Sequence, residues 1–546
     1  MRTASILSLV FAIAGAGNAV PFRREDGNGT ESNDPLTVTT LTGVFTGELN
    51  AAYPNVREFR SIPFAQPPIG DRRWLPPLAA PLSGRHYYAL RYPPSCPQYL
   101  TKKPSLWNAN ITDFAIGTRG QSLLAGVQAQ TSSEDCLSLA IWAPLPPSAS
   151  SSNATQPLLP VAIFIPGGDF QAGGVDVPYQ MPAPLVSRRG DLIVVTLNYR
   201  VNIFGFPNAA ALQDQNLGIL DQRMAVEWLY ANIRAFGGDP DRMILWGQSA
   251  GAVAADIHNY AYYDNPIVSG YYLMSGTAAV AGIPADPLYS NFSSVARLVG
   301  CDFGTGTARD PDAEIACMRR VPADLLTNVV GQYAENATKP ALNFRPVPDD
   351  RIYFANYSAR AAAGFMADRP ALVSTTSNED TGLYLYPATN LTAGPYMPAV
   401  DNGTLVIFVC PAANTTRWRG RLPGQRSTTY RYQYAGNFSS VTPFPWMGAY
   451  HASDIPMVFG TLDRRPADVR TPFEDQVSAT MEDHFAAFVA DPEDGLRQRG
   501  WLPDNGSPDG GFMIRFAAGD TPQKQINSLE VDGACYGQGS YNNSPS

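Results

Sequence analysis

Short apolar runs and amphipathic stretches alternate along the middle of the chain. Val161–Ile165 and Leu192–Leu197 are almost continuously apolar, which is typical of strands buried on both faces of a sheet. Between Asp221 and Phe236 apolar residues recur at helical spacing, and another apolar run follows at Met243–Trp246. Because strands alternate with helical stretches, the pattern predicts an α/β fold with a large, mostly parallel central sheet flanked by helices.

The pattern also divides the chain. Residues 1–19 combine an early arginine, a short apolar stretch and small residues, as a secretory signal peptide does. The largely polar residues 20–35 are expected to form a flexible leader. Residues 36–546 then form one α/β domain, which opens with a β-hairpin within Leu36–Leu49. The stretch Pro144–Pro160, rich in Pro, Ser and Asn, is expected to be a surface loop.

The composition narrows the range of partners. Hydrophobic residues make up 45% of the chain, charged residues make up 16%, and the net charge is −9. This acidic balance argues against nucleic-acid and anionic-membrane partners. After the signal peptide, no apolar run is long enough to span a bilayer. We therefore expect a secreted, extracellular protein without stable membrane insertion, and the sequence leaves its oligomeric state open.

Sequons and cysteines are typical of the same compartment. The six cysteines are an even number, as disulfide pairing requires, and none has the spacing of a metal site. Asn-x-Ser/Thr sequons mark surface loops in a glycosylated chain. Twelve are present, at Asn28, Asn110, Asn153, Asn291, Asn336, Asn356, Asn390, Asn402, Asn414, Asn437, Asn505 and Asn542.

The pentapeptide Gly247–Gly251 is the most specific chemical motif. It has the sequence Gly-Gln-Ser-Ala-Gly, follows the apolar run Met243–Trp246 and precedes a small-residue stretch that favours a helix. A Gly-x-Ser-x-Gly between strand and helix is the context of a nucleophile elbow, a sharp turn that exposes the serine hydroxyl. Ser249 is therefore the candidate nucleophile. The alternative is a small-residue turn that only packs a helix onto the sheet.

A serine hydroxyl needs a base to accept its proton, and the chain offers four histidines. His86 precedes the predicted sheet core, and His484 lies in a predicted amphipathic helix. His258 lies on the helix that leads away from Ser249 and cannot turn back to it. His451 follows the serine in the chain order of α/β-hydrolases, within a loop of small residues. His451 is therefore the candidate base.

The third group should be a carboxylate between Ser249 and His451 that orients the imidazole and stabilises its charged form. Glu379 follows residues 370–376, a predicted strand with a polar end, so it would lie at the carboxyl end of that strand. The neighbouring Asp380 is the alternative acid. A solvated surface carboxylate is the alternative for either residue.

Acyl transfer also needs N–H donors directed at the developing oxyanion. Gly167, Gly168 and Asp169 follow the run Val161–Ile165 after a single proline, in a position to supply them. The amide of Ala250, next to the candidate nucleophile, would supply another donor. An ordinary turn at the end of a strand is the alternative for this Pro-Gly-Gly sequence.

Taken in order, these motifs resemble the type-B carboxylesterase family, which includes cholinesterases and one class of fungal lipases. The resemblance covers almost the whole chain after the signal peptide. It implies an α/β-hydrolase fold and a triad of Ser249, His451 and Glu379 that needs no metal or organic cofactor. It also implies the disulfides Cys96–Cys136, Cys301–Cys317 and Cys410–Cys535. The segments that carry it are Gly43–Gly47, Phe59–Pro68, Ser133–Leu137, Asn216–Arg223, Ala235–Pro240, Gly247–Gly251 and His451–Gly460.

Some features depart from the family pattern. Gln248 precedes the nucleophile where many relatives have glutamate, so one anion is absent there. Asp169 takes the place of a usual third glycine, and its carboxylate must point away from the oxyanion. Trp107 is not spaced from Cys136 as the choline-binding tryptophan is, so cholinesterase activity is not expected. The loop of forty residues from Cys96 to Cys136 is closer to a lipase-type lid than to a tight cholinesterase loop.

Together these residues predict a secreted serine carboxylic-ester hydrolase that acts on a small-molecule ester through a covalent acyl-enzyme. A lipase or an acyltransferase of the same fold would use the same residues, so both remain alternatives. A non-catalytic, cholinesterase-like adhesion module is a further alternative, although such modules usually lack a member of the triad.

Overall fold

The structure is a computed structural model. It describes residues 34–101, 103–114, 132–146, 157–280, 286–304, 308–386, 390, 392–421, 428–464, 468–507 and 509–544. Contacts divide the chain into two units, Met1–Pro35 and Leu36–Ser546. Only Asp34 and Pro35 of the first unit are described, so the predicted signal peptide 1–19 and nearly all of the predicted leader 20–35 lie outside the described residues.

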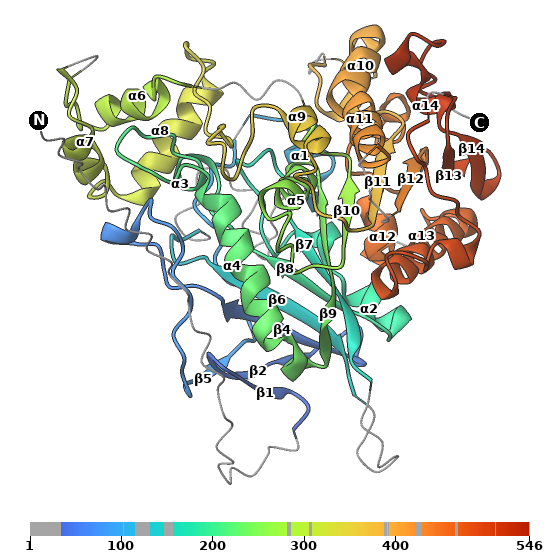
Figure 1. The fold of residues 1–546 in the computed structure, drawn as a ribbon, viewed down its shortest axis with the longest axis horizontal. Coiled ribbons are helices and arrows are strands. Elements are labelled where there is room, and N and C mark those ends of the chain that lie inside the picture. The colour runs from blue at the N-terminus through green and yellow to red at the C-terminus, as the bar shows by residue number, and fades with distance from the viewer. Residues whose placement is uncertain are drawn as a thin grey trace, which may run out of the picture. The chain divides into compact units, whose positions relative to one another are not determined.

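The second unit is built on an eleven-stranded sheet with the order β14-β13-β12-β11-β10-β9-β7-β8-β6-β4-β3 (Figure 1). Neighbours pair in parallel from β8 to β13 and antiparallel at both ends, so the predicted, mostly parallel sheet is confirmed. The strands are β3 (Glu48–Leu49), β4 (Val56–Pro63), β6 (Ser138–Pro144), β7 (Leu159–Ile165), β8 (Ile193–Leu197), β9 (Gly238–Gln248), β10 (Gly270–Met274), β11 (Ala371–Thr376), β12 (Thr429–Tyr434), β13 (Phe512–Ala518) and β14 (Thr521–Asn527).

A second, three-stranded sheet contains the predicted N-terminal hairpin. Strands β1 (Thr37–Thr40) and β2 (Gly43–Thr46) pair antiparallel, and β5 (His86–Tyr88) adds a parallel strand beside β2. The hairpin is local in sequence and could be predicted from its turn, whereas β5 joins it from some forty positions further along the chain.

Helices cover both faces of the large sheet (Figure 1). Helices α4 and α5 share one apolar core with it, and α2, α12 and α13 share another. None of the described helices is both long and apolar enough to cross a membrane. The helices are α1 (Leu106–Ala109), α2 (Ala183–Arg189), α3 (Asn202–Gly205), α4 (Leu217–Asn232), α5 (Ala250–Ala261), α6 (Ser290–Leu298), α7 (Pro311–Met318), α8 (Ala323–Glu335), α9 (Tyr357–Ala362), α10 (Met397–Gly403), α11 (Cys410–Arg419), α12 (Ile455–Phe459), α13 (Pro472–Ala490) and α14 (Leu529–Asp532).

Strand β7 shows why the central runs are apolar throughout. Val161, Ile163 and Ile165 belong to the core shared with α4 and α5, whereas Ala162 and Phe164 belong to the core shared with α2, α12 and α13. Because helices cover both faces, neither set of side chains reaches water. Each fully buried large side chain contributes about 1.5–3 kcal/mol relative to exposure.

Strand β9 is longer than its apolar run predicts. It begins at Gly238, which pairs with Leu159, so the Asp239–Pro240 pair lies within the strand rather than in a turn before it. The polar start escapes prediction because side chains there are only partly covered, and the apolar pattern begins where the sheet is buried. The predicted loop Pro144–Pro160 is also shortened at its ends by β6 and β7, and its residues 147–156 lie outside the described residues.

Candidate active site

Ser249 occupies the sharp turn between β9 and α5. Its backbone has φ 57° and ψ −126°, and its amide donates to the Met274 carbonyl at 2.8 Å. A positive φ costs a non-glycine residue about 1–3 kcal/mol and persists only where the surroundings enforce it. The partly exposed serine is the last residue before the helix. This strand–turn–helix geometry is that of the predicted nucleophile elbow.

The two glycines of the motif allow this turn to form. A Cβ on Gly247 would lie 2.2 Å from the backbone of Gly251, and a Cβ on Gly251 would lie 2.0 Å from the Ile165 carbonyl oxygen. Both clashes are with backbone atoms, so no side-chain rotation could relieve them. The glycines therefore let α5 start directly against β7, the strand that leads into Gly167–Asp169, the glycine loop.

His451 and Glu379 meet at the sheet edge where Ser249 lies. Glu379 begins a short 3₁₀ turn, η7 (Glu379–Gly382), three residues after β11. Its Oε2 lies 2.6 Å from His451 Nδ1, and its backbone carbonyl accepts the His451 amide at 3.2 Å. Because β9 and β11 are both parallel to β10, their carboxyl ends lie at one edge. Distant segments of the chain thus form one buried pair beside the elbow.

Asp380, the alternative acid, is held elsewhere. Its amide donates to Thr404 Oγ1 at 3.1 Å, and its carboxylate packs against Gly403, where a Cβ would approach it to 2.0 Å. Burial raises the pKa of the Asp380 carboxyl to about 6, and the Glu379 charge acts in the same direction while His451 opposes it. Glu379, not Asp380, accepts the hydrogen bond from the imidazole.

The other three histidines have partners away from Ser249. His86 on β5 is exposed and lies 2.8 Å from Thr46 Oγ1. His258 on α5 contacts Gln222 Oε1 at 3.3 Å, and burial lowers its pKa to about 3. His484 on α13 lies 2.6 Å from Gln523 Oε1, and burial lowers its pKa to about 4. His258 and His484 therefore stay neutral near pH 7.

The glycine loop after β7 presents free amides beside the elbow. Among the described residues, no acceptor takes the backbone N–H of Gly168, Asp169 or Ala250. A Cβ on Gly167 would lie 3.1 Å from the Cβ of Ser249, which shows how close the loop and the elbow are. Unpaired amides at such a place can stabilise a developing oxyanion.

The Asp169 carboxylate forms an ion pair with Arg345. Arg345 Nε donates to its Oδ1 at 2.8 Å, and the second guanidinium nitrogen bonds the other oxygen. The Asp169 side chain is 62% exposed. The Asp169 carboxylate is thus neutralised by Arg345 and partly hydrated.

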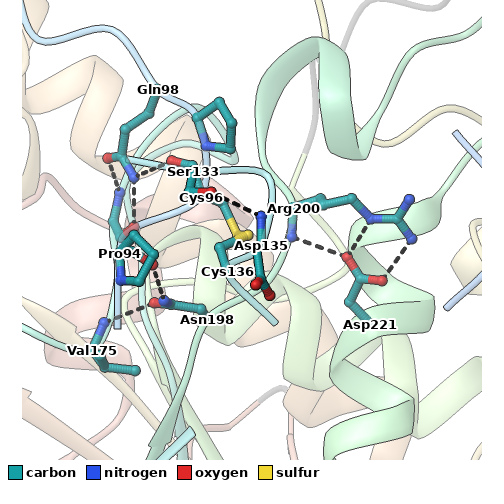
Figure 2. Close-up of a disulfide and its surroundings, with 12 residues drawn as sticks. Pro94, Cys96, Gln98, Ser133, Asp135, Cys136, Val175, Asn198, Arg200 and Asp221 are labelled. Carbon is teal, nitrogen blue, oxygen red and sulfur yellow. Dashed lines mark hydrogen bonds and ion pairs between the residues drawn. A yellow bond between two sulfur atoms is a disulfide. The ribbon is translucent and has the colours of Figure 1, made fainter. Parts of the chain in front are cut away.

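The segment after the glycine loop is fixed beside a disulfide (Figure 2). The Asn198 side chain accepts the Val175 amide and donates to the Pro94 carbonyl, both at 3.0 Å. Gln98 accepts the Gly173 amide at 2.9 Å and donates to the Gly173 carbonyl at 3.0 Å. Pro94 and Gln98 lie on either side of Cys96, and the disulfide Cys96–Cys136 cross-links this segment of the chain. The residues after the glycine loop are therefore bound to a cross-linked segment.

The three disulfides are Cys96–Cys136, Cys301–Cys317 and Cys410–Cys535, the pairs that the resemblance implies. The Cys410–Cys535 pair joins the start of α11 to a 3₁₀ turn near the end of the chain. Among the described residues, no group of three or more His, Cys, Asp or Glu side chains is placed to hold a metal ion.

A second buried carboxyl lies near the pair. Asp454 Oδ2 accepts from Tyr432 at 3.0 Å, and the Tyr432 hydroxyl lies 2.6 Å from that of Tyr272. Burial raises the pKa of Asp454 to about 7, and the charge of Glu379 raises it too, against the opposing effects of Tyr432 and His451. Asp454 is thus partly protonated at neutral pH.

Several side-chain contacts around His451 and η7 could not be predicted from the sequence. The Phe408 ring lies 4.8 Å from the imidazole of His451, and Gln248 Nε2 lies 3.1 Å from its Nε2. Trp107 donates its indole N–H to the Gly382 carbonyl at 3.0 Å, so it packs on η7. Only Gln248 had a local signal, its position beside the serine. Phe408 comes from the π-helical segment η8 (Thr404–Val409), whose place depends on the fold.

A cavity of about 260 Å³ adjoins the glycine loop. It is bordered by Gln171 and Asn202 on the loop side and by Tyr99 and α8 on the other. A larger hollow of about 980 Å³ includes Ser269 and Pro370, which precede β10 and β11. That hollow lies at the amino ends of these strands, opposite the edge that holds the candidate catalytic residues.

The sheet order, the elbow after β9 and the carboxylate–imidazole pair at the same edge define an α/β-hydrolase. A solved structure of a PNB esterase has the same fold. The two structures superpose with a TM-score of 0.71 over 91% of this chain and 98% of that chain, with 23% identical residues.

The chain belongs to the carboxylesterase family, whose sequence profile matches residues 34–395. It is 36% identical to the chlorogenic acid esterase of Aspergillus niger, over 99% of this chain and 95% of that protein. It is 34% identical to secreted lipase 5 of Gibberella zeae, over 93% of this chain and 95% of that protein. The protein is therefore a carboxylic ester hydrolase, as the sequence motifs predict.

Proposed function

We propose that the protein is a secreted serine esterase in which Ser249 is the nucleophile and His451 the general base and acid. Glu379 orients the imidazole and stabilises its charged form. The observation that carries the proposal is the 2.6 Å contact between Glu379 Oε2 and His451 Nδ1, beside a serine held at positive φ on a nucleophile elbow. Asp380 takes no part in the triad.

In the acylation step, the Ser249 hydroxyl proton passes to His451 Nε2 while Oγ bonds the ester carbonyl carbon. The carbonyl electron pair moves to oxygen, where the amides of Gly168, Asp169 and Ala250 donate to the oxyanion, with Gly167 giving the loop its close approach. When the carbonyl re-forms, the bond to the alcohol breaks and His451 gives the alcohol its proton. The acyl group then remains on Ser249.

In the deacylation step, water takes the place of the alcohol. His451 removes one proton from the water as its oxygen attacks the acyl carbon, and then returns the proton to Ser249 Oγ. The products are the carboxylic acid and the free enzyme. An acyltransferase would differ only in admitting a second alcohol instead of water, and the same residues would serve it.

Secretion is supported by the disulfides, by the name of the Gibberella zeae relative and by the sequons. Asn291 is only 9% exposed and donates to the Asn343 carbonyl, so its sequon is not on the surface. Asn110 is partly exposed. The exposed sequon asparagines are Asn336, Asn356, Asn390, Asn402, Asn414, Asn437, Asn505 and Asn542, so the proposal includes glycosylation at some of these sites.

The names of the relatives suggest two substrate classes. The relative that aligns with 99% of this chain is named a chlorogenic acid esterase, and others are named lipases. We propose a soluble ester as the first substrate to test, with chlorogenic acid among the candidates and long-chain lipid esters as the alternative.

The test is hydrolysis of p-nitrophenyl esters from acetate to palmitate, and of chlorogenic acid, by the full protein and by Ser249→Ala. The alanine variant should lose activity by about a millionfold, since a triad acts as a unit. An organophosphate should label Ser249 in the unmodified protein only. Preference for palmitate and a rise in rate above the solubility limit would indicate a lipase. A product formed with an added alcohol would indicate an acyltransferase. Retained turnover in Ser249→Ala would contradict the proposal.

A further inference from the structure

The side chain of Gln248 lies against the ring nitrogen of His451 that must accept the serine proton. Gln248 is the last residue of β9, is 4% exposed, and places its Nε2 3.1 Å from His451 Nε2. Among the described residues, no other side chain or backbone group forms a hydrogen bond with that ring nitrogen. A buried side chain in this place acts on His451 itself.

The partners of His451 fix which atom donates. A carboxylate only accepts hydrogen bonds, so the 2.6 Å contact with Glu379 requires the proton of the neutral ring to be on Nδ1. The other nitrogen, Nε2, then has a lone pair and accepts. The Gln248 amide N–H is the donor to it. If Nε2 carried a proton, the two N–H groups would oppose each other.

The other end of the Gln248 amide lies close to the glycine loop. Its Oε1 faces the glycine loop, where a Cβ on Gly167 would approach it to 3.0 Å. The Phe408 ring covers His451 from the side of η8, 4.8 Å from the imidazole. The amide therefore lies between His451 and the glycine loop.

We propose that Gln248 is a positioning residue that holds His451 in its neutral, basic form and extends activity to lower pH. The inference rests on the proposed function. The donor bond exists only while Nε2 is unprotonated, so it favours the neutral imidazole, and it breaks when Nε2 takes the Ser249 proton. The neutral side chain also leaves out the anion that a glutamate would place beside the imidazolium.

Other charged groups face His451 and stay the same in every comparison below. Glu379 and Asp380 lie on η7, and Asp454 lies on the segment that carries the histidine itself. From β9 the neighbour is the uncharged Gln248, and from η8 it is Phe408. On the glycine loop, Asp169 is paired with Arg345. The same charged groups are present in all three proteins, so a difference between their pH profiles reports the change at Gln248.

The experiment is the pH dependence of kcat/KM on p-nitrophenyl butyrate for the full protein, Gln248→Glu and Gln248→Met. The carboxylate would accept from a protonated Nε2, so Gln248→Glu should move the acidic limb up by about one pH unit. Activity well below the limb should then be about tenfold lower than in the unmodified protein. Gln248→Met removes the donor without adding charge, so it should move the limb in the same direction by less.

Gln523→Glu is the matched control, because Gln523 also faces a histidine but lies on the edge strand β14. It should leave the profile unchanged. Coincident profiles for both Gln248 variants and the unmodified protein, with normal thermal unfolding, would overturn the inference while leaving serine-dependent turnover intact. If Gln248→Glu does not fold, the Gln248→Met profile alone decides. Absence of serine-dependent turnover in the unmodified protein would instead refute the proposed function, and this inference with it.

Discussion

At the residue scale, the site depends on small departures from ordinary backbone and side-chain behaviour. Ser249 has a positive φ, and the glycines at Gly247 and Gly251 lie where any Cβ would meet backbone. Asp169 also has a positive φ, of 59°, in the glycine loop. Such conformations are uncommon outside glycine and gather where function requires a fixed geometry.

The roles of the two neighbouring acids can be separated by amide substitution. Glu379→Gln should lower kcat by about 10⁴-fold, because the amide can hold the wrong tautomer of His451. Asp380→Asn should change kcat by less than about tenfold, since its carboxylate packs on Gly403 and makes no bond to the imidazole. Steady-state rates with one p-nitrophenyl ester decide between them. The reverse order of losses would exchange their assignments.

Asp454 should make stability depend on pH. Burial raises its pKa from 3.8 to about 7, so the folded state binds this proton more tightly than the unfolded state. The resulting stabilisation is fully present below about pH 3.8 and is lost as pH rises through about 7. Asp454→Asn has no such proton, so its melting temperature relative to the unmodified protein should increase by several degrees between pH 4 and pH 8.

Calorimetry across this range measures the effect. The quantity to follow is the difference in melting temperature between Asp454→Asn and the unmodified protein. The melting temperature of either protein alone also changes, because the buried His258 and His484 have lowered pKa values and destabilise the fold as pH falls. Those contributions are common to both proteins and cancel. A difference that stays constant with pH would show that Asp454 titrates alike in the folded and unfolded states.

At the element scale, buried charge pairs fix how loops and helices meet. Arg200, which follows β8, binds the carboxylate of Asp221 on α4 through Nε at 2.8 Å and a terminal nitrogen at 2.7 Å (Figure 2). The side chains are 3% and 0% exposed. The backbone amide of Arg200 donates to the same carboxylate at 3.0 Å. The pair therefore joins the segment after β8 to the helix that packs on the sheet.

Asp221→Asn should lower the free energy of unfolding by about 3–5 kcal/mol, because it leaves the Arg200 guanidinium buried without a counter-charge. The matched control is Asp239→Asn, which breaks the partly exposed pair with Arg242. That change should cost less than about 1 kcal/mol. Urea unfolding of both variants measures the two losses. Equal losses would mean that the burial of the Arg200–Asp221 pair does not govern its contribution.

The sequence could predict some secondary-structure elements and not others. Local patterns of apolar residues and turns predict β7, β8, α4 and the hairpin β1–β2, and the structure confirms all of them. The start of β9 and the strand β5 were not predicted, because their pairing depends on partners rather than on their own sequence. An edge or an end of a strand is partly exposed and lacks the apolar signature.

At the scale of the whole molecule, disulfides constrain segments far apart in sequence. Cys410–Cys535 closes a separation of 125 residues, whereas Cys301–Cys317 closes only 16. In the chain-entropy account, the longer loop removes more freedom from the unfolded state. Cys410 also follows η8 directly, the segment whose Phe408 lies on His451.

Replacing both Cys410 and Cys535 by alanine should therefore destabilise the protein by about 2 kcal/mol more than replacing Cys301 and Cys317, since the entropy grows with the logarithm of loop length. Unfolding in urea, followed by circular dichroism, gives both values. The ester hydrolysis rate at 25 °C shows whether loosening η8 also disturbs the base. A smaller loss from the long-range pair would argue that native-state strain or residual structure outweighs loop entropy.

The sequence by itself determined the nucleophile motif, the fold class and the small set of residues that could act together with Ser249. The elbow is local: five residues, an apolar run before and a helix after are enough to make Ser249 the candidate nucleophile. The chain order and the family resemblance made His451 the candidate base and favoured Glu379 over Asp380 as the candidate acid. These features are predictable because propensity, periodicity and motif spacing act over short stretches of chain.

Only the tertiary structure decided how these residues meet. The sequence left Glu379 and Asp380 beside each other, and the 2.6 Å contact to His451 distinguishes them because it depends on where β11 ends and how the loop after β12 returns. The contacts of Gln248 and Phe408 with the imidazole likewise join segments far apart in sequence. Local patterns carry no information about such distances, because they arise from the packing of the whole sheet.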